Sequence, residues 1–324
     1  MTRSTMSLPH SVLDTIGNTP LVRLRRVVPK SCARIVVKLE GRNPTGSMKD
    51  RMAEALIGTA ERDGRLQQGW TVVEYSGGST GASLAMVCAA KGYPIRIFSS
   101  DAFSEEKLVQ MAAFGAELTI IKSADGLITK KVIQDMIAAA QEASCQSDTF
   151  WPDQLNNADM IPGYYPMGQE IWDQTGGEVD AFVHSIGTSA SLQGVAMVLR
   201  RNRPGVRIVA VEPAESAVLS GGPPGAHKME GIGIGYVPPL WNPSMVDEIM
   251  PISTAESETM ALRLCEEEGL FAGTTSGGNV VAAIRLGQQL GPKATVATLL
   301  VDSGLRYLAT YGKMLAPRIG RHSA

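Results

Sequence analysis

Short apolar segments alternate with helical segments along the whole chain, and this order constrains the fold more than any other feature. Residues 33–39 (ARIVVKL) and 71–75 (TVVEY) are typical of buried strands. The other predicted strands are 95–99, 117–122, 181–185, 206–211 and 295–301, and the predicted helices are 50–63, 82–91, 105–114, 126–143, 192–200, 255–268 and 278–290. Because parallel strands need crossover helices, the order predicts an α/β fold of two doubly wound domains with mostly parallel sheets and a ligand at the strands' carboxyl ends.

The composition is that of an ordinary globular protein, with 44% hydrophobic and 19% charged residues among 324 and a net charge of -2. The near-neutral charge and the lack of a long basic run argue against a nucleic-acid partner. Residues 1–7 are polar and no apolar stretch is long enough to span a bilayer, so we expect a cytoplasmic protein without a membrane partner. The cysteines and histidines lack the spacing of metal ligands, and no metal site is expected.

Lys49 stands between a small-residue turn and a predicted helix start, in the segment PTGSMKDR (44–51). A lysine amine is a covalent catalyst, able to form a Schiff base with an aldehyde, when desolvation lowers its pKa toward neutrality. Most lysines are instead solvated surface charges, so the catalytic interpretation of Lys49 depends on the loops that follow.

The loop 187–191 (GTSAS) follows a predicted strand and opens a predicted helix. Its small residues let backbone N–H groups approach an anion, the helix dipole favours negative charge, and the hydroxyls of Thr188, Ser189 and Ser191 can donate further hydrogen bonds. The pattern therefore indicates a phosphate site, and an ordinary turn with Ser/Thr capping is the alternative.

The loop 76–81 (SGGSTG) has the same design, and Ser76, Thr80 and backbone amides could bind a carboxylate there. A dinucleotide site is the rival interpretation, since Asp101 lies at a suitable distance downstream to meet a ribose. The glycines of this loop, however, are not spaced as GxGxxG, which weakens the dinucleotide interpretation.

Two further small-residue segments lie where a strand ends or a helix begins. Ser303, in VDSG (301–304), follows the last apolar strand, where its hydroxyl could point toward a site, and a simple turn is the alternative. The segment GTTSGG (273–278) could let a flat ring lie close to the backbone, or could merely start a helix.

Together these segments resemble the cysteine synthase and cystathionine β-synthase family, whose members are pyridoxal-phosphate enzymes with the fold of the tryptophan synthase β subunit (PLP fold type II). Many blocks occur in the family's order through nearly the whole chain, which is far more specific than any one block. The blocks are IGNTPLV (16–22), KLE (38–40), NPTGSMKDR (43–51), Gln154 with Asn157, GQEI (168–171), HKMEGIG (227–233) and DSGLRY (302–307).

The resemblance implies pyridoxal 5'-phosphate as the cofactor and suggests roles by position. Lys49 would be the catalytic residue, joined to the cofactor as an internal aldimine and later moving the substrate's α-proton. The loop 187–191 would cradle the phosphate, and Ser303 would face the pyridine nitrogen. The expected cofactor contacts besides Lys49 are Ser79, Gly187, Thr188, Ser189, Ala190, Ser191, Gly273 and Ser303, and the expected substrate contacts are Ser76, Thr80, Gln154 and Gly231.

The chain departs from the family's pattern at three places that bear on the substrate. The substrate loop is usually TSGNTG, so Ser79 replaces an asparagine and Gly77 replaces a serine, which removes a donor and is predicted to open space beside the substrate. The phosphate loop is usually GTGGT, so Ser189 and Ala190 add side chains. Glu230 stands where O-acetylserine-type enzymes often have glutamine.

The activity implied by the resemblance is β-replacement. An activated serine (O-acetylserine, O-phosphoserine or serine itself) would give an aminoacrylate, to which sulfide or another nucleophile adds, forming cysteine or a β-substituted alanine. A β-eliminating lyase or a synthase of an unusual β-substituted alanine in a specialised pathway is the alternative, and a non-catalytic cofactor-binding relative is a third. The expected partners are small-molecule substrates and a second copy in a homodimer.

The expected domains are discontinuous in sequence. Residues 1–18 and 42–152 would form a smaller, mobile N-terminal α/β domain with the substrate-carboxylate loop. Residues 19–41 and 153–324 would form a larger C-terminal α/β domain with the phosphate and ring site.

Overall fold

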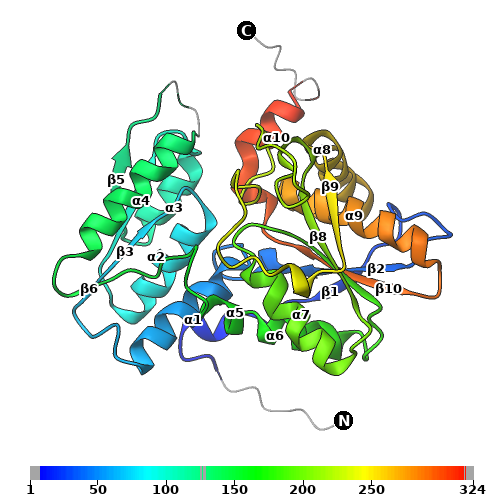
Figure 1. Cartoon of the computed structure of the whole chain (residues 1–324), viewed down its shortest axis with the longest axis horizontal. Helices are drawn as coiled ribbons and strands as arrows, with labels where there is room; N and C mark the ends of the chain where they lie inside the picture. Colours follow the sequence, from blue (N-terminus) through cyan, green and yellow to red (C-terminus); the bar gives the residue numbers. More distant parts are fainter. Residues whose placement is uncertain (1–7, 125, 127–128, 317, 319–324) are drawn as a thin grey trace. The chain divides into compact units, whose positions relative to one another are not determined.

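The chain is folded into two compact units, and neither is a continuous stretch of sequence. The computed structural model, drawn in Figure 1, describes residues 8–124, 126, 129–316 and 318. The first unit comprises Met1–Asn18, Asn43–Thr45 and Lys49–Gln154, and the second comprises Thr19–Arg42, Gly46–Met48 and Leu155–Ala324. The assignment of a mobile substrate domain and a cofactor domain stays a prediction.

The first unit contains a parallel sheet in the order β5-β4-β3-β6, as far as the described residues extend. Its strands are β3 (Thr71–Tyr75), β4 (Ile95–Ser100), β5 (Glu117–Ile121) and β6 (Thr149–Phe150), and its helices are α1 (Lys49–Arg62), α2 (Ser79–Lys91), α3 (Glu105–Ala113), α4 (Lys130–Ser144) and the 3₁₀ turn η1 (Val12–Thr15). The fully buried side chains of Leu84, Ile97 and Met111 show how α2, β4 and α3 share one core.

Two helix starts in the first unit differ from the prediction. Helix α2 begins at Ser79, inside the small-residue loop, rather than at residue 82. Helix α4 begins at Lys130 rather than at 126, because Gly126 has a left-handed φ of 68° and the Thr129 hydroxyl caps the helix by accepting a hydrogen bond from Val132 N at 3.2 Å.

The second unit contains a larger sheet in the order β1-β2-β10-β7-β8-β9, in which only β1 and β2 pair antiparallel among the described strands. The strands are β1 (Leu21–Arg23), β2 (Arg34–Leu39), β7 (Ala181–Ser185), β8 (Arg207–Pro213), β9 (Glu248–Ile252) and β10 (Thr295–Leu300). The helices are α5 (Met160–Gly163), α6 (Tyr165–Gln174), α7 (Ala190–Asn202), α8 (Thr254–Arg263), α9 (Thr274–Leu290) and α10 (Leu308–Met314). The shorter turns are η2 (Glu40–Arg42), η3 (Ala214–Ser216), η4 (Pro243–Met245), η6 (Gly304–Tyr307) and the π-helical η5 (Leu264–Glu268).

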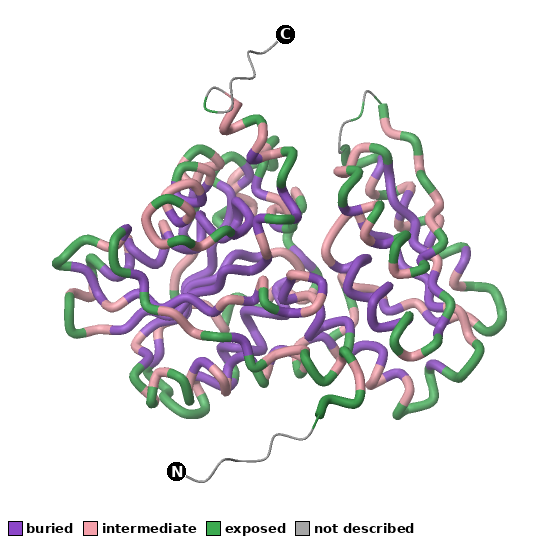
Figure 2. Tube along the Cα trace, turned by 180° about the vertical axis from the view of Figure 1, so that it is seen from behind, coloured by how far each residue is buried: buried purple, intermediate pink, exposed green. Residues whose placement is uncertain are grey.

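The central strands of the second unit are covered on both faces. Every residue of β7 and of β10 is buried. Figure 2 colours such buried stretches purple along the Cα trace. Parallel strands between two helical layers have this burial, and it explains why both read as continuous apolar runs in the sequence. The expectation of an α/β fold with mostly parallel sheets is confirmed.

The edges of this sheet were not predicted from the sequence. Strand β1 has only three residues, and β9 contains Pro251, which cannot donate to a ladder and is therefore tolerated at a sheet edge. Helices α7 and α9 also begin earlier than predicted, at Ala190 and Thr274 rather than at 192 and 278.

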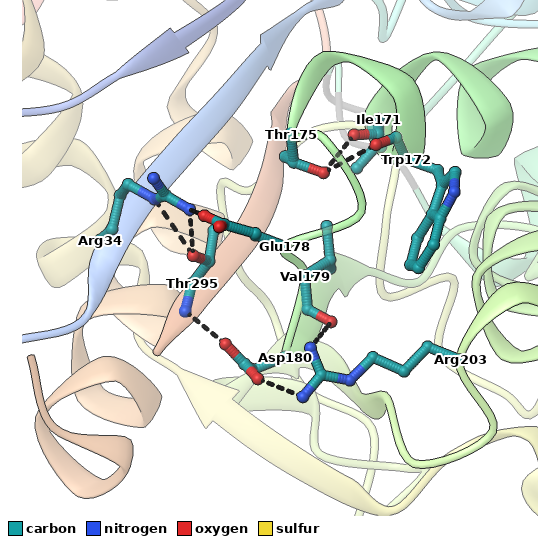
Figure 3. A network of polar contacts seen from close by, with 9 residues as sticks. All are labelled: Arg34, Ile171, Trp172, Thr175, Glu178, Val179, Asp180, Arg203 and Thr295. Carbon is teal, nitrogen blue, oxygen red and sulfur yellow. Dashed lines mark hydrogen bonds and ion pairs between the residues drawn. The ribbon is translucent and has the colours of Figure 1, made fainter. Parts of the chain in front are cut away.

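Polar side chains close the amino ends of the central strands of the second unit (Figure 3). The Arg34 guanidinium lies 2.6 Å from Glu178 and donates to the Thr295 hydroxyl at 2.8 Å. The Asp180 carboxylate accepts from Thr295 N at 2.8 Å and pairs with Arg203 at 2.6 Å. These groups satisfy one another, so we infer that this end of the sheet serves stability, and the chemistry is to be sought at the carboxyl ends.

Candidate active site

In the second unit, the loop after β7 presents unused backbone donors. Ser189 has φ 75° and ψ -20°, in the left-handed region, directly before Ala190 starts α7. The backbone N–H groups of residues 187–192 find no acceptor within the described part of the chain. Four such groups are left open at any helix N-terminus, and together with the helix dipole they attract an anion. The loop predicted to bind phosphate therefore has the donors that a phosphate requires.

Gly187 lies against the segment that carries Gly231. A Cβ atom at Gly187 would lie 2.5 Å from the Gly231 carbonyl oxygen, so only glycine fits. Gly231 itself has φ 81°, and Gly233 N donates to Ile186 O at 3.3 Å. The structure thus brings together two predicted site elements that are distant in sequence.

The Ser191 hydroxyl contacts a histidine that the sequence analysis did not assign to the site. His184 lies on β7, is fully buried, and its Nε2 is 2.8 Å from Ser191 Oγ. Its signal in the sequence was a titratable residue within an apolar strand that runs directly into the predicted phosphate loop.

Ser303 lies just beyond β10, beside Gly273. Two segments, one carrying Gly273 and the other Ser303, are joined by an antiparallel β-bridge between Ala272 and Ser303. Gly273 N also donates a hydrogen bond to Asp302 O at 3.2 Å. A Cβ atom at Gly273 would lie 2.3 Å from Asp302 Oδ1, which explains the glycine. The Ser303 hydroxyl accepts from Leu305 N at 3.2 Å, so its own hydrogen can be donated elsewhere.

The segment 46–48 is fixed to the same strand end. Ser303 N donates to Gly46 O at 2.8 Å, and Met48 N donates to Val301 O at 2.9 Å. Lys49, the next residue along the chain, opens α1 of the first unit and is partly exposed.

Tyr307 stabilises the turn that follows Ser303. Burial, followed by the nearby Asp302 and Glu230 carboxylates, raises the pKa of the Tyr307 hydroxyl well above its ordinary value. The hydroxyl therefore stays protonated and donates to Asp302. Sequence reasoning gave neither residue a role, although both lie in the DSGLRY block.

Asp50 fixes the start of α1 in the first unit. Its buried carboxylate accepts from Thr45 N at 2.8 Å, from the Thr45 hydroxyl at 2.6 Å and from the Ser83 hydroxyl at 2.6 Å. Ser83 lies on α2. Asp50, the residue after Lys49, is therefore hydrogen-bonded to the helix that begins in the predicted substrate loop. This acidic residue was missed as a site-organising residue, although it stands beside the catalytic candidate.

A second lysine, Lys38 on β2, shows what a structural lysine looks like in this chain. Its fully buried Nζ donates to Thr19 O at 2.5 Å and to Gln174 Oε1 at 2.9 Å, and it forms an ion pair with Glu170 at 2.6 Å. These partners compensate the desolvation of the buried charge and occupy its hydrogens. Lys38 is thus not a candidate for covalent catalysis.

The loop of the first unit that is predicted to bind the substrate is organised by its own serine. The Ser76 hydroxyl accepts from Gly78 N at 3.2 Å and from Gly81 N at 2.9 Å, which uses two of the donors at the start of α2. Ser79 and Thr80 lie in the first turn of this helix, where Thr80 is buried and Ser79 is partly exposed.

Gly77 does not open the space that the sequence analysis expected. A Cβ atom at Gly77 would lie 2.2 Å from the ring of Phe103, so that ring already fills the place of the missing side chain. The expectation of room at this point beside the substrate is wrong, because a residue distant in sequence packs there. Phe103 is partly exposed and precedes α3.

Gln154 is held at the end of β3 by its own amide and by Glu74. Gln154 Nε2 donates to Tyr75 O at 2.8 Å. The Glu74 carboxyl accepts from Gln154 N at 3.2 Å, from Tyr75 N at 3.0 Å and from Trp151 Nε1 at 3.1 Å. Burial raises the pKa of Glu74 to about 8, despite these donors. Glu74 thus joins the strand to the segment that carries Gln154, and sequence reasoning did not identify it.

The described residues hold no group of three histidine, cysteine or acidic side chains that could bind a metal ion. Among the helices in the described ranges, none combines the length and apolar character needed to cross a bilayer.

The chemistry of the predicted site residues fits pyridoxal phosphate. The start of α7 offers open N–H donors to a phosphate, and the close approach of Gly231 O requires a residue without a side chain at Gly187. At the end of β7, the Ser185 hydroxyl is buried and has no hydrogen-bond partner within the described residues. Lys49 would supply an amine for the aldehyde, and Ser303 a hydroxyl for the ring nitrogen.

Comparisons with known proteins agree with this chemistry. A family model described as "Pyridoxal-phosphate dependent enzyme" matches residues 12–302. A cysteine synthase from Staphylococcus aureus is 39% identical over 302 residues, covering 93% of this chain and 96% of the relative.

Two solved structures are similar over most of their length. An O-acetyl serine sulfhydrylase (isoform 3) from Entamoeba histolytica has a TM-score of 0.88 and 37% identity, covering 95% of this chain and 92% of that one. An O-acetylserine dependent cystathionine beta-synthase from Helicobacter pylori has a TM-score of 0.86 and 31% identity, covering 94% and 98%. The chain therefore belongs to the cysteine synthase family of pyridoxal-phosphate dependent enzymes, with PLP fold type II.

Proposed function

We propose that this enzyme is a β-replacement synthase. It takes an activated serine (O-acetylserine, O-phosphoserine or serine itself) and adds sulfide or another nucleophile, giving cysteine or a β-substituted alanine. The cysteine synthase from Staphylococcus aureus and the O-acetyl serine sulfhydrylase from Entamoeba histolytica support this reaction class by their similarity to the chain.

One observation carries the proposal. Gly46 and Met48, shortly before Lys49, are hydrogen-bonded to the segment after β10 that carries Ser303. Asp50, the residue after Lys49, is held by Thr45 and Ser83. The lysine is therefore fixed on both sides along the chain. A lysine that acts as a covalent catalyst needs such support. Its side chain is long and flexible, so its amine can be placed accurately only if the backbone that carries it is held in place.

Pyridoxal phosphate, when bound, supplies a conjugated ring that accepts the electron pair released from the substrate. We assign the phosphate to the open N–H donors of residues 187–191, and the aldehyde to the Lys49 amine. The Ser303 hydroxyl would face the ring nitrogen, and Ser79 and Gly273 would contact the ring.

The chain's own residues then bind the amino acid and move its proton. Ser76, Thr80 and Gln154 would hold the α-carboxylate, with Gly231 at the substrate's side. The freed Lys49 amine would take the α-proton and return it after the nucleophile has added.

A second reaction outcome is favoured by Phe103. Its ring fills the place of a side chain at Gly77. An apolar ring there, instead of a hydroxyl, would leave less room and no donor for a large second substrate. We therefore keep β-elimination, or a specialised β-substituted alanine, as the alternative.

The test is a panel of donors with and without sulfide, using the enzyme loaded with pyridoxal phosphate. The synthase predicts a thiol amino acid with sulfide and little pyruvate. Pyruvate and ammonia with no replacement product would overturn the synthase in favour of the lyase. Lys49→Ala is expected to lower turnover about 1,000-fold or more, since covalent and proton-transfer roles are both lost. A Lys38→Met variant is the matched control that removes a buried lysine outside the proposed chemistry.

We also propose that the enzyme is a homodimer, by similarity to its family. Sedimentation velocity of the full chain tests this, and a single species at the mass of one chain at micromolar concentration would contradict it.

A further inference from the structure

His184 is a buried titratable group that the proposed reaction does not use. It is the fourth residue of β7, has no exposed surface, and its Nε2 lies 2.8 Å from Ser191 Oγ. Ser191 is the second residue of α7, whose first N–H groups are open. A histidine directly behind an anion site bears on how that site's hydroxyl is oriented.

Asn279 on α9 determines which nitrogen of His184 carries the proton. The Asn279 Oδ1 accepts from Ser185 N at 2.9 Å, which identifies the other end of the amide as the nitrogen. That Nδ2 donates to Leu299 O at 3.0 Å and lies 3.5 Å from His184 Nδ1. Because an amide nitrogen only donates, His184 Nδ1 faces it as an acceptor and the proton lies on Nε2.

The direction of the next hydrogen bond follows. With the proton on Nε2, His184 donates to Ser191 Oγ, and the serine uses a lone pair for this contact. The Ser191 hydrogen is then free to point away from β7. A serine without this neighbour could turn its hydrogen toward a carbonyl of the preceding loop instead.

We propose that His184 is a positioning residue for the cofactor phosphate, holding Ser191 as a hydrogen-bond donor. This inference rests on the proposed phosphate role of residues 187–191. It adds a specific consequence: His184 strengthens binding of pyridoxal phosphate and leaves the binding of pyridoxal, which lacks the phosphate, unchanged.

The variants His184→Gln and His184→Asn test whether a donor at the place of Nε2 is needed, because both replace the imidazole ring with a smaller amide. The glutamine amide reaches the place of Nε2 and can still donate to Ser191, whereas the shorter asparagine amide reaches only the place of Nδ1. We expect His184→Asn to weaken pyridoxal phosphate binding about tenfold, the effect of one hydrogen bond to a charged group, and His184→Gln to stay within about twofold.

The readout is the dissociation constant of each ligand for the cofactor-free full chain, measured by fluorescence titration. Thr298→Val is the matched control: this buried hydroxyl on β10 donates to Val183 O at 2.7 Å, so its loss disturbs the same sheet away from the loop. The dissociation constant of pyridoxal divided by that of pyridoxal phosphate should fall in His184→Asn and stay nearly unchanged in His184→Gln and Thr298→Val. Equal weakening of both ligands, no weakening, or identical behaviour of the two variants would overturn the proposal.

Ser191→Ala distinguishes this inference from the proposed site itself. It should reproduce the loss seen in His184→Asn, and the double variant should lose no more than either single one. If Ser191→Ala loses selectivity for the phosphate and His184→Asn does not, the role of His184 is wrong and the phosphate loop stands. If Ser191→Ala and Gly187→Ala both keep that selectivity, the proposed phosphate loop falls, and the role of His184 falls with it.

Discussion

The turns after β3 and β7 have the same plan but use their backbone donors differently. Each strand has five residues, a buried titratable residue in fourth place, and a small-residue loop that opens a helix. After β3, Ser76 accepts from two of the loop's N–H groups. After β7, the corresponding groups have no acceptor in the described chain, and Ser191 bonds backward to His184.

This difference indicates which ligand each turn suits. A turn that satisfies part of its own donors offers fewer N–H groups to a ligand, which suits a singly charged carboxylate that must bind and dissociate in each turnover. A turn that leaves all its first donors open suits a more highly charged group that stays bound. The following predictions test this contrast, from the largest expected effect to the smallest.

Gly187→Ala should have the largest effect. Its Cβ would lie 2.5 Å from the Gly231 carbonyl oxygen, and moving that backbone would misalign the open donors. We expect pyridoxal phosphate affinity to fall about 100-fold or more, as overpacking disrupts several hydrogen bonds at once. Gly78→Ala is the control in the other turn, where the nearest atom would be Lys107 Cδ at 3.8 Å. Equal effects of the two variants would contradict the contrast.

Ser76→Ala should destabilise the turn after β3, whereas Ser191→Ala should also weaken the binding of the cofactor. Removing the Ser76 hydroxyl leaves the N–H groups of Gly78 and Gly81 without their acceptor. We expect a loss of about 1–3 kcal/mol in the free energy of unfolding, measured by urea titration of the cofactor-free chain. Ser191→Ala instead leaves the buried His184 Nε2 without its acceptor, so its stability also falls, and the two variants differ in pyridoxal phosphate affinity, which only Ser191→Ala should lower. An unchanged affinity in Ser191→Ala would count against the comparison.

Gly77→Ser should raise the KM for the amino-acid donor about tenfold, because its Cβ meets the Phe103 ring at 2.2 Å and the loop must shift. Phe103→Ala in the same chain should restore most of the loss. Steady-state kinetics of the two single variants and the double variant measure this coupling. Additive effects would show that the ring and the loop act independently.

The smallest effect on ligand binding is expected at Glu74, whose influence is on the pH dependence of stability. Its pKa in the folded chain is about 8, above the ordinary 4.5, so the folded state holds a proton that the unfolded state has lost between these values. The free energy of unfolding should therefore fall as pH rises from about 4.5 to about 8, and level off above that. Glu74→Gln should flatten this slope in urea titrations across the range, whereas Glu54→Gln, an exposed residue on α1, should not.

The fold was predictable where apolar periodicity is strong. Strands β3 and β7 have the predicted bounds, since buried parallel strands are continuous apolar runs between loops. The starts of α2, α7 and α9 were placed too late, because the helical residues before the predicted starts are only serine, threonine, glycine and alanine, which carry no periodic pattern. Edge strand β9 was missed because Pro251 argues against a strand until its edge position is known.

The site was predictable as a set of loops, but the contacts that organise them were not. Small residues after strands indicated both turns correctly as turns. Phe103 beside Gly77, and Glu74 beside Gln154, join residues whose separation in sequence gives no local signal. His184 behind Ser191 depends on how one strand enters one helix, which only the three-dimensional structure shows.

The pairing of β2 with β10 bears on how the chain is made. These strands pair in parallel from Arg34 with Thr295 to Leu39 with Leu300, so the paired residues Arg34 and Thr295 lie 261 positions apart along the chain, and β2 leaves the ribosome long before β10 does. Until then β2 can form only its short hairpin with β1, and an apolar edge stays uncovered. A nascent chain of this topology is therefore exposed to chaperones, and to aggregation, while the residues between these two strands are synthesised.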